Sequence, residues 1–133
     1  MAVAATAGIE TGSGPLMAGR VGGVRRSRRL HHRVYCIELD TSVRGDRRFQ
    51  QQNRYTKPSM TCLYVGSTGL DPAVRYANHL RGHKGCPLVR KYGLRLREDL
   101  YADFPAMTWA DAVATEVAWA KELRELGYAV YQN

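Results

Sequence analysis

The chain has 133 residues, enough for one folded domain with a modest hydrophobic core. Its 20 Lys and Arg residues outnumber its 12 Asp and Glu residues, so the net charge is +8. This balance favours a polyanionic partner, most often nucleic acid, over a protein that is merely basic. No apolar run approaches the ~20 residues that cross a bilayer, and no membrane partner is expected.

The cysteine pattern excludes a zinc motif and a disulfide framework. Cys36, Cys62 and Cys86 are odd in number and too widely spaced for paired ligands. Free thiols in a reducing cytoplasm are the expectation, with Cys36 and Cys62 inside the core because both lie in apolar strand patterns.

Residues 1–30 have low sequence complexity and end in the basic run of residues 24–29. They lack the periodic apolar residues that build a core, so a disordered basic N-terminal arm with non-specific phosphate affinity is predicted. Two alternatives remain, namely translation from Met17 and a transit peptide. The folded domain is expected over residues 31–133.

The first structured part predicts two strands joined by a loop. Residues 33–39 alternate and are rich in β-formers, which indicates a strand. A polar, basic connection follows over residues 40–59. Residues 61–66 form the second expected strand, which Gly66 ends.

A helix is expected next, because Asp71 can cap it and Pro72 suits its first position. It runs to about Arg81 and ends at Gly82. Its expected apolar stripe consists of Val74, Ala77 and Leu80. A short second helix is predicted over residues 87–92.

The last part predicts a third strand over residues 100–104, a long helix over residues 109–126 capped by Thr108, and a short strand over residues 128–132. The order of elements indicates an α+β fold. Its expected centre is a small antiparallel sheet of about three strands with helices packed on it.

One carboxylate stands out on the long helix. Its apolar face is predicted to contain Trp109, Ala112, Val113, Val117, Ala120 and Leu123. Glu116 projects into the middle of that face, whereas the other acids of the helix lie on the opposite side. A buried carboxylate needs a cation, a metal or a donor network as partner. From the helix alone, a structural Glu held by a core Arg or Tyr is the more frequent explanation.

An ordered set of residues gives Glu116 a context. Val34 and Tyr35 lie in the first strand, Tyr64, Val65 and Gly66 follow in the second, and Arg75 and His79 share one side of the next helix. This order resembles the GIY-YIG nuclease superfamily over residues 31–133. Tyr35 matches the first half-motif, and Tyr64 with Gly66 matches the second.

Within this resemblance, Arg75 matches the family's helical arginine, His79 its frequent histidine and Glu116 its metal-binding glutamate, while Asn133 corresponds to an asparagine near the domain's end. The sequence also departs from the pattern. Arg33 replaces the usual first glycine, Val34 replaces isoleucine, and the connection from Tyr35 to Tyr64 is longer than usual.

The resemblance implies a metal-dependent endonuclease that hydrolyses DNA phosphodiester bonds. Glu116 would hold one Mg²⁺ or Mn²⁺ ion, with waters in the other positions. Arg75 would stabilise transition-state charge on the phosphate. Tyr35 or Tyr64 would act as base or orient water, with a pKa lowered by Arg75 and the metal, and His79 would bond a tyrosine hydroxyl or assist proton removal.

Cations also cluster between Arg75 and Arg97, a stretch without any acid. A nucleic-acid backbone is expected to contact Arg81, Lys84, Arg90 and Lys91, although an ordinary solvated basic surface is an equal alternative. Two other functions remain open. One is an inactive nucleic-acid-binding module of the same fold, and the other is an enzyme acting on a small phosphorylated metabolite. The oligomeric state and the substrate specificity are left open.

Overall fold

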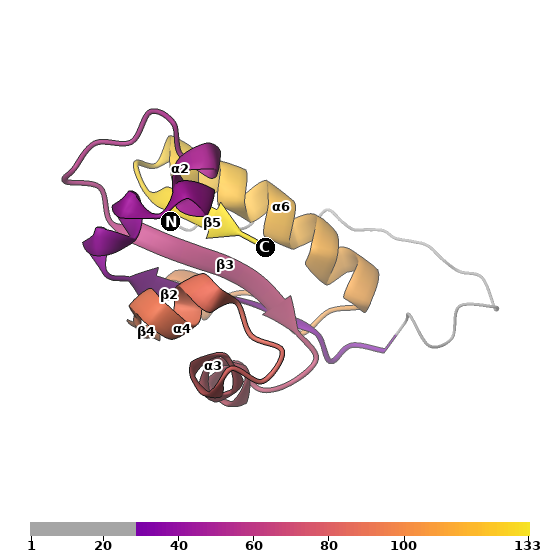
Figure 1. The fold of residues 1–133 in the computed structure, drawn as a ribbon. Helices are drawn as coiled ribbons and strands as arrows, with labels where there is room; N and C mark the ends of the chain where they lie inside the picture. Colours follow the sequence, from indigo (N-terminus) through magenta and orange to yellow (C-terminus); the bar gives the residue numbers. More distant parts are fainter. Residues whose placement is uncertain (1–28) are drawn as a thin grey trace.

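A twisted four-stranded sheet forms the centre of the molecule (Figure 1). The computed structural model describes residues 29–133, so the arm predicted for residues 1–30 lies almost wholly outside the described part. The spatial strand order is β4 (Gly93–Leu96), β2 (Arg33–Leu39), β3 (Cys62–Thr68) and β5 (Ala129–Gln132). The helices are η5 (Thr41–Gly45), α2 (Arg47–Gln52), α3 (Pro72–Arg81), α4 (Pro87–Tyr92), α5 (Glu98–Tyr101) and α6 (Trp109–Glu125).

The α+β prediction is confirmed, but the expected three-stranded antiparallel sheet is wrong in one respect. β2 pairs antiparallel with β3 and β4, and β5 adds a fourth strand parallel to β3. The third strand lies at Gly93–Leu96 and not at residues 100–104. Residues 98–101 form α5 instead, since Glu98 and Asp99 in its first turn suit a helix N-terminus.

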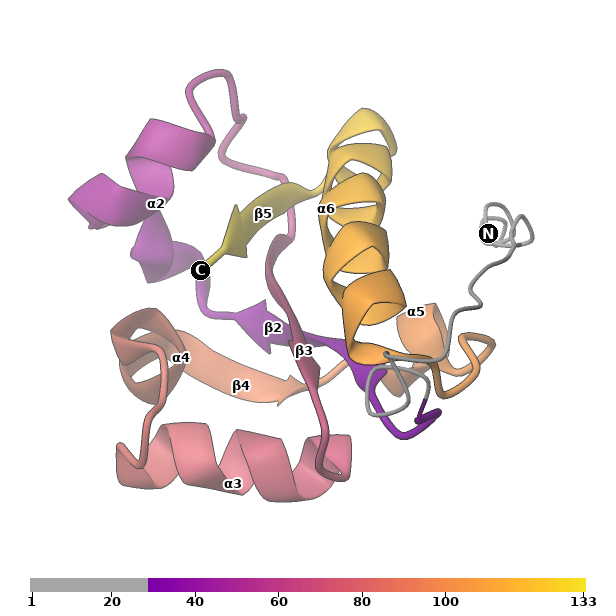
Figure 2. The same cartoon turned by 90° about the vertical axis from the view of Figure 1, so that its right-hand side faces the viewer.

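Helices cover both faces of the sheet (Figure 2). α6 lies on one face, where alternate strand residues such as Val34, Leu63 and Val65 pack against Ala120 and Leu123. The intervening strand residues point to the other face, toward α2, α3 and α4. No helix within residues 29–133 is long and apolar enough to cross a membrane.

The connection over residues 40–59 contains helices that the sequence did not indicate. The Asp40 carboxylate caps η5 by accepting from the Ser42 N–H, and the Asp46 carboxylate caps α2 by accepting from the Arg48 N–H. Val43 and Phe49 are fully buried. These two apolar side chains therefore hold an otherwise polar segment on the sheet. The segment was predicted to be a loop because most of its residues are polar.

Side-chain amides cover the outer edge of β5. Asn53 Oδ1 accepts from the Val130 N–H at 2.8 Å, and Asn53 Nδ2 donates to the Val130 carbonyl at 2.9 Å. Gln52 makes the same pair of bonds with Gln132, at 2.9 and 2.7 Å. Two residues at the end of α2 thus take the place of a fifth strand and satisfy the exposed backbone groups.

The face of α3 that contacts the sheet is polar. Val74 and Leu80 of the predicted apolar stripe are 50% and 44% exposed, whereas Asn78 and His79 are buried. The predicted apolar stripe of this helix is therefore wrong, although the bounds of the helix are as expected. The buried imidazole has hydrogen-bond partners, which removes most of the cost of placing a polar group there.

Candidate active site

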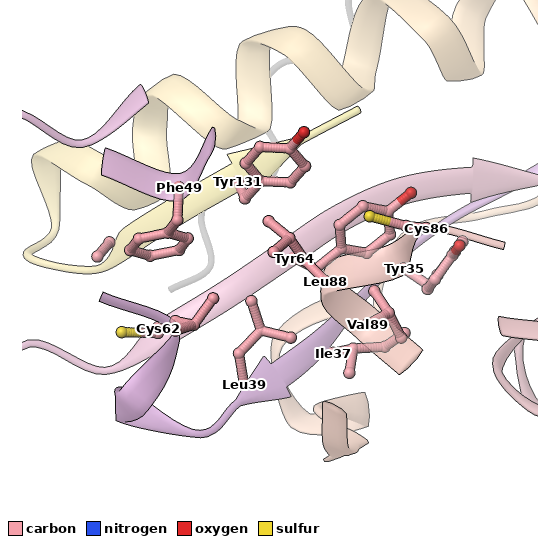
Figure 3. Packing of buried hydrophobic residues seen from close by; sticks show 12 residues of the cluster. Tyr35, Ile37, Leu39, Phe49, Cys62, Tyr64, Cys86, Leu88, Val89 and Tyr131 are labelled. Carbon is pink, nitrogen blue, oxygen red and sulfur yellow. The ribbon is translucent and has the colours of Figure 1, made fainter. Parts of the chain in front are cut away.

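Two tyrosines from adjacent strands form the centre of the site. Tyr35 lies directly opposite Gly66, and both Tyr35 and Tyr64 point toward α4, with ring centroids 6.2 Å apart. Tyr64 also stacks on Tyr131 of β5 at 6.4 Å. Figure 3 shows these three rings side by side on one face of the sheet.

Gly66 is required by the packing of these rings. A Cβ atom at this position would lie 2.9 Å from Tyr35 Oη, closer than Cβ atoms approach other atoms, and 3.0 Å from Tyr64 Cε2, which is also an unusually tight contact. Both contacts are to rigid rings. The strand continues through Gly66 to Thr68, so the expectation that this glycine ends the strand is wrong.

His79 fixes the orientation of Tyr35. The Cys86 backbone N–H donates to His79 Nδ1 at 2.9 Å, so this nitrogen carries no proton. In the neutral ring the proton is then on Nε2, which donates to Tyr35 Oη at 2.8 Å. Because the Tyr35 oxygen accepts this bond, its own O–H remains able to donate to a second group.

Burial keeps all three of these side chains uncharged. It raises the pKa of Tyr35 to about 12, against a smaller lowering by the nearby Arg75 charge. Burial also raises the pKa of Tyr64 and lowers that of His79 to about 4, with Arg75 contributing to the second shift. The expectation that Arg75 lowers a tyrosine pKa is right for its direction, but burial outweighs it.

Arg75 lies beside this group and is held by backbone. Its Nη2 donates to the Lys84 carbonyl at 2.9 Å. Lys84 has φ = 53°, a left-handed conformation that is costly for a residue with a side chain. The turn after α3 therefore orients a guanidinium whose charge acts on Tyr35, Tyr64 and His79.

Glu116 approaches from α6 on the other side of the sheet. It is half-buried, and its Oε2 accepts from Gln132 Nε2 at 3.1 Å. β5 stops at Gln132, opposite Val65 and one residue before Gly66. Glu116 thus lies at the end of β5. Its negative charge raises the pKa of both Tyr35 and Tyr64.

The surroundings of Glu116 differ from the predicted apolar face. Ala112, Ala120 and Leu123 are buried as expected, but Trp109 and Val117 are 59% and 57% exposed. Val113 is also exposed, at 39%. The helix is rotated so that Ala112, Glu116, Trp119, Ala120 and Leu123 face the sheet, which follows the 3.6-residue period with a different phase.

The partner of Glu116 is a residue that the sequence analysis missed. Gln132 reaches Glu116, whereas Asn133 is exposed beyond the end of β5. The alternation of β5 gives the signal that was overlooked, because Val130 packs in the cluster under α6 and Gln132 is two residues further along. The Cys86 N–H bonds to His79, and the Lys84 carbonyl accepts from Arg75. Both are backbone groups, so the residue types in the sequence give no indication of these two bonds.

The donor set is compatible with one hard divalent cation. Within residues 29–133, no group of three or more His, Cys, Asp and Glu side chains is arranged to hold a metal. Glu116 supplies a single carboxylate with one oxygen already bonded to Gln132. Mg²⁺ accepts one or two protein carboxylates and retains its waters, so a single carboxylate fits this ion better than zinc.

The predicted basic surface is smaller than the sequence suggested. Arg95 and Arg97 pair with Glu38, and Arg97 also pairs with Asp99. The remaining exposed cations border α3 and α4, namely Arg81, Lys84, Arg90 and Lys91. Of these four residues, Lys84 is in contact with Arg75, because its backbone carbonyl accepts from Arg75 Nη2.

Comparisons with known proteins yield no match: no family model, no curated protein and no solved structure is similar to the chain. The resemblance to GIY-YIG nucleases therefore rests on the ordered residues of the sequence and stays a prediction.

Proposed function

We propose that residues 31–133 are a nuclease domain of the GIY-YIG type that hydrolyses DNA phosphodiester bonds. One observation carries the proposal. Tyr35, Tyr64 and His79 form one buried group, in which His79 bonds to Tyr35 at 2.8 Å. Glu116 on α6 lies at the end of β5, the strand that pairs with β3 beside Tyr64.

The residues have separate roles in this proposal. Arg75 binds a phosphate oxygen and stabilises the negative charge that grows during attack. Tyr35 is fully buried and its oxygen accepts from His79, so its proposed role is to fix the geometry of the site and not to contact the substrate. With a pKa of about 12, Tyr35 is protonated at neutral pH and does not act as a base. His79 is a positioning residue.

Glu116 is the residue proposed to hold one Mg²⁺ or Mn²⁺ ion, which when bound would neutralise phosphate charge and stabilise the leaving oxygen. Gln132 orients the carboxylate by donating to Oε2. The cations along α3 and α4 bind the nucleic-acid backbone beside this site.

Nicking of supercoiled plasmid tests the proposal. We expect nicking with Mg²⁺ or Mn²⁺, none with EDTA, and a loss of at least ~100-fold in both Glu116→Gln and Arg75→Ala. Arg75→Ala should lower the turnover rate more than DNA affinity. The matched control is Glu125→Gln, which removes the same charge from an exposed position of α6 paired with Lys121, and it should nick normally.

Nicking that survives Glu116→Gln would exclude the metal role of this residue. A wild-type protein that binds DNA without nicking it would favour the second candidate, an inactive binding module of the same fold. That candidate is supported by the raised pKa values of Tyr35 and Tyr64, which leave no tyrosine base at neutral pH. Absence of both nicking and salt-dependent DNA binding would contradict both candidates.

A further inference from the structure

A separate pocket lies on the α6 side of the sheet, at the end where β3 begins. Its volume is about 570 Å³. Phe104 and Trp119 form an aromatic wall, with ring centroids 4.9 Å apart at 79°, and Leu123 adds an aliphatic surface. The size and the apolar lining are typical of sites that enclose small molecules.

The pocket is bordered by acidic side chains, although the protein as a whole is strongly basic. Asp99, Asp103 and Glu122 all line it. Asp99 is engaged by Arg97, with bonds of 3.0 Å to both of its oxygens. Across residues 29–133, neither Asp103 nor Glu122 takes part in an ion pair. Two carboxylates therefore remain to receive a cation.

We propose that this pocket binds a small organic cation, with an aromatic or branched apolar body against Phe104 and Trp119 and an amine that pairs with Asp103 and Glu122. The aromatic faces favour such a ligand further, because they attract cations. Nothing in this site takes part in the proposed nuclease chemistry, whose tyrosines lie on the opposite face of the sheet.

The structure favours a free small molecule over a peptide. Peptides that dock on a sheet usually pair with an open strand edge. The outer edge of β5, the strand that follows the pocket residues Gly127 and Tyr128, is already bonded by Gln52 and Asn53. A ligand held by side chains alone suits the pocket better.

The test is a titration of the ¹⁵N-labelled full chain with tryptamine, observed at the two tryptophan indole N–H signals. Trp119 lines the pocket, whereas Trp109 is 59% exposed at the other end of α6 and serves as an internal reference. We expect the Trp119 signal alone to shift, saturating with a Kd below about 1 mM, as suits a ligand of this size. Trp109→Phe assigns the two signals.

Charge specificity is tested with indole-3-acetate, which has a similar ring and the opposite charge and should bind at least ~10-fold more weakly. The double variant Asp103→Asn, Glu122→Gln should weaken tryptamine at least ~5-fold, and Glu125→Gln should leave it within about 2-fold. Equal binding of both compounds, or an unchanged Kd in the double variant, would overturn the proposal. So would binding only of the dipeptide amide Trp-Arg, which would assign the pocket to a peptide.

Discussion

The two faces of the sheet are built from the same strands but are stabilised by different interactions. Under α6, Val34, Leu63 and Val65 interdigitate with small and aliphatic side chains. Under α3, the same strands present Tyr35 and Tyr64 to a buried imidazole. The face under α6 is stabilised mainly by apolar burial, whereas the face under α3 also depends on the hydrogen bonds that orient His79 and Tyr35.

The face under α6 therefore contributes mainly to stability, whereas the face under α3 carries residues of the proposed active site. The α6 face is mostly apolar, and its acids lie at its margins: Glu116 lies where β5 ends, and Glu38 pairs with Arg95 and Arg97. The face under α3 has less apolar contact, because it holds three titratable side chains, Tyr35, Tyr64 and His79. Changes on the first face should alter the free energy of unfolding, while changes on the second should also alter its dependence on pH.

The largest effect is expected from Leu63→Ala. Leu63 is fully buried under α6, so its truncation should lower the free energy of unfolding by about 3–5 kcal/mol, through lost burial and a residual cavity. Urea unfolding at pH 7.5 measures this change. A loss below about 1 kcal/mol would show that apolar packing on this face is not what holds α6.

The second prediction concerns acid. The pKa of His79 is lowered to about 4 in the folded protein, whereas an unfolded histidine titrates near 6.5. Between these values the unfolded chain binds the extra proton, so stability is complete above pH 6.5 and falls as the pH drops toward 4. The expected loss is about 2–3 kcal/mol, measured by urea unfolding across this range.

Two variants isolate this contribution. His79→Gln should flatten the profile between pH 6.5 and 4.5, before most carboxylates titrate, whereas the exposed His83→Gln should keep it. The same slope in all three proteins would mean that His79 is not the group responsible.

The smallest effect is expected from Tyr35→Phe. The ring remains, but His79 Nε2–H loses its acceptor in a buried position, at a cost of about 1–2 kcal/mol. Thermal unfolding compares it with Tyr55→Phe, a control at a 93% exposed tyrosine that should change nothing. A Tyr35→Phe protein as stable as the wild type would indicate that the hydrogen bond contributes nothing net.

The sequence predicted those features that depend on local signals. Asp71, Pro72 and Gly82 bound α3, Thr108 caps α6, and β2 spans the expected residues. All three cysteines are free and buried, as expected for Cys36 and Cys62. Such signals lie within a few residues of the element they define, so they survive without knowledge of the fold.

Several of the failures involve long-range contacts. α3 buries His79 instead of Val74 because Tyr35, 44 residues earlier, supplies a partner for the imidazole. β4 lies at Gly93–Leu96 because Ile37 and Glu38 pair with it. The roles of the predicted site residues stay predictions. The bonds of Gln132 and of the Lys84 carbonyl could not be predicted, because they depend on where β5 ends and how the turn after α3 bends.

The side-chain amides that bond to the outer edge of β5 couple two segments that are distant in the sequence. Gln52 and Asn53 bond to residues about 80 positions later, so any opening that lifts the end of α2 uncovers a bare strand. An uncovered strand edge is a template on which another chain can pair. Partial unfolding of α2 would therefore promote self-association. The net positive charge of the protein otherwise opposes contact between its copies.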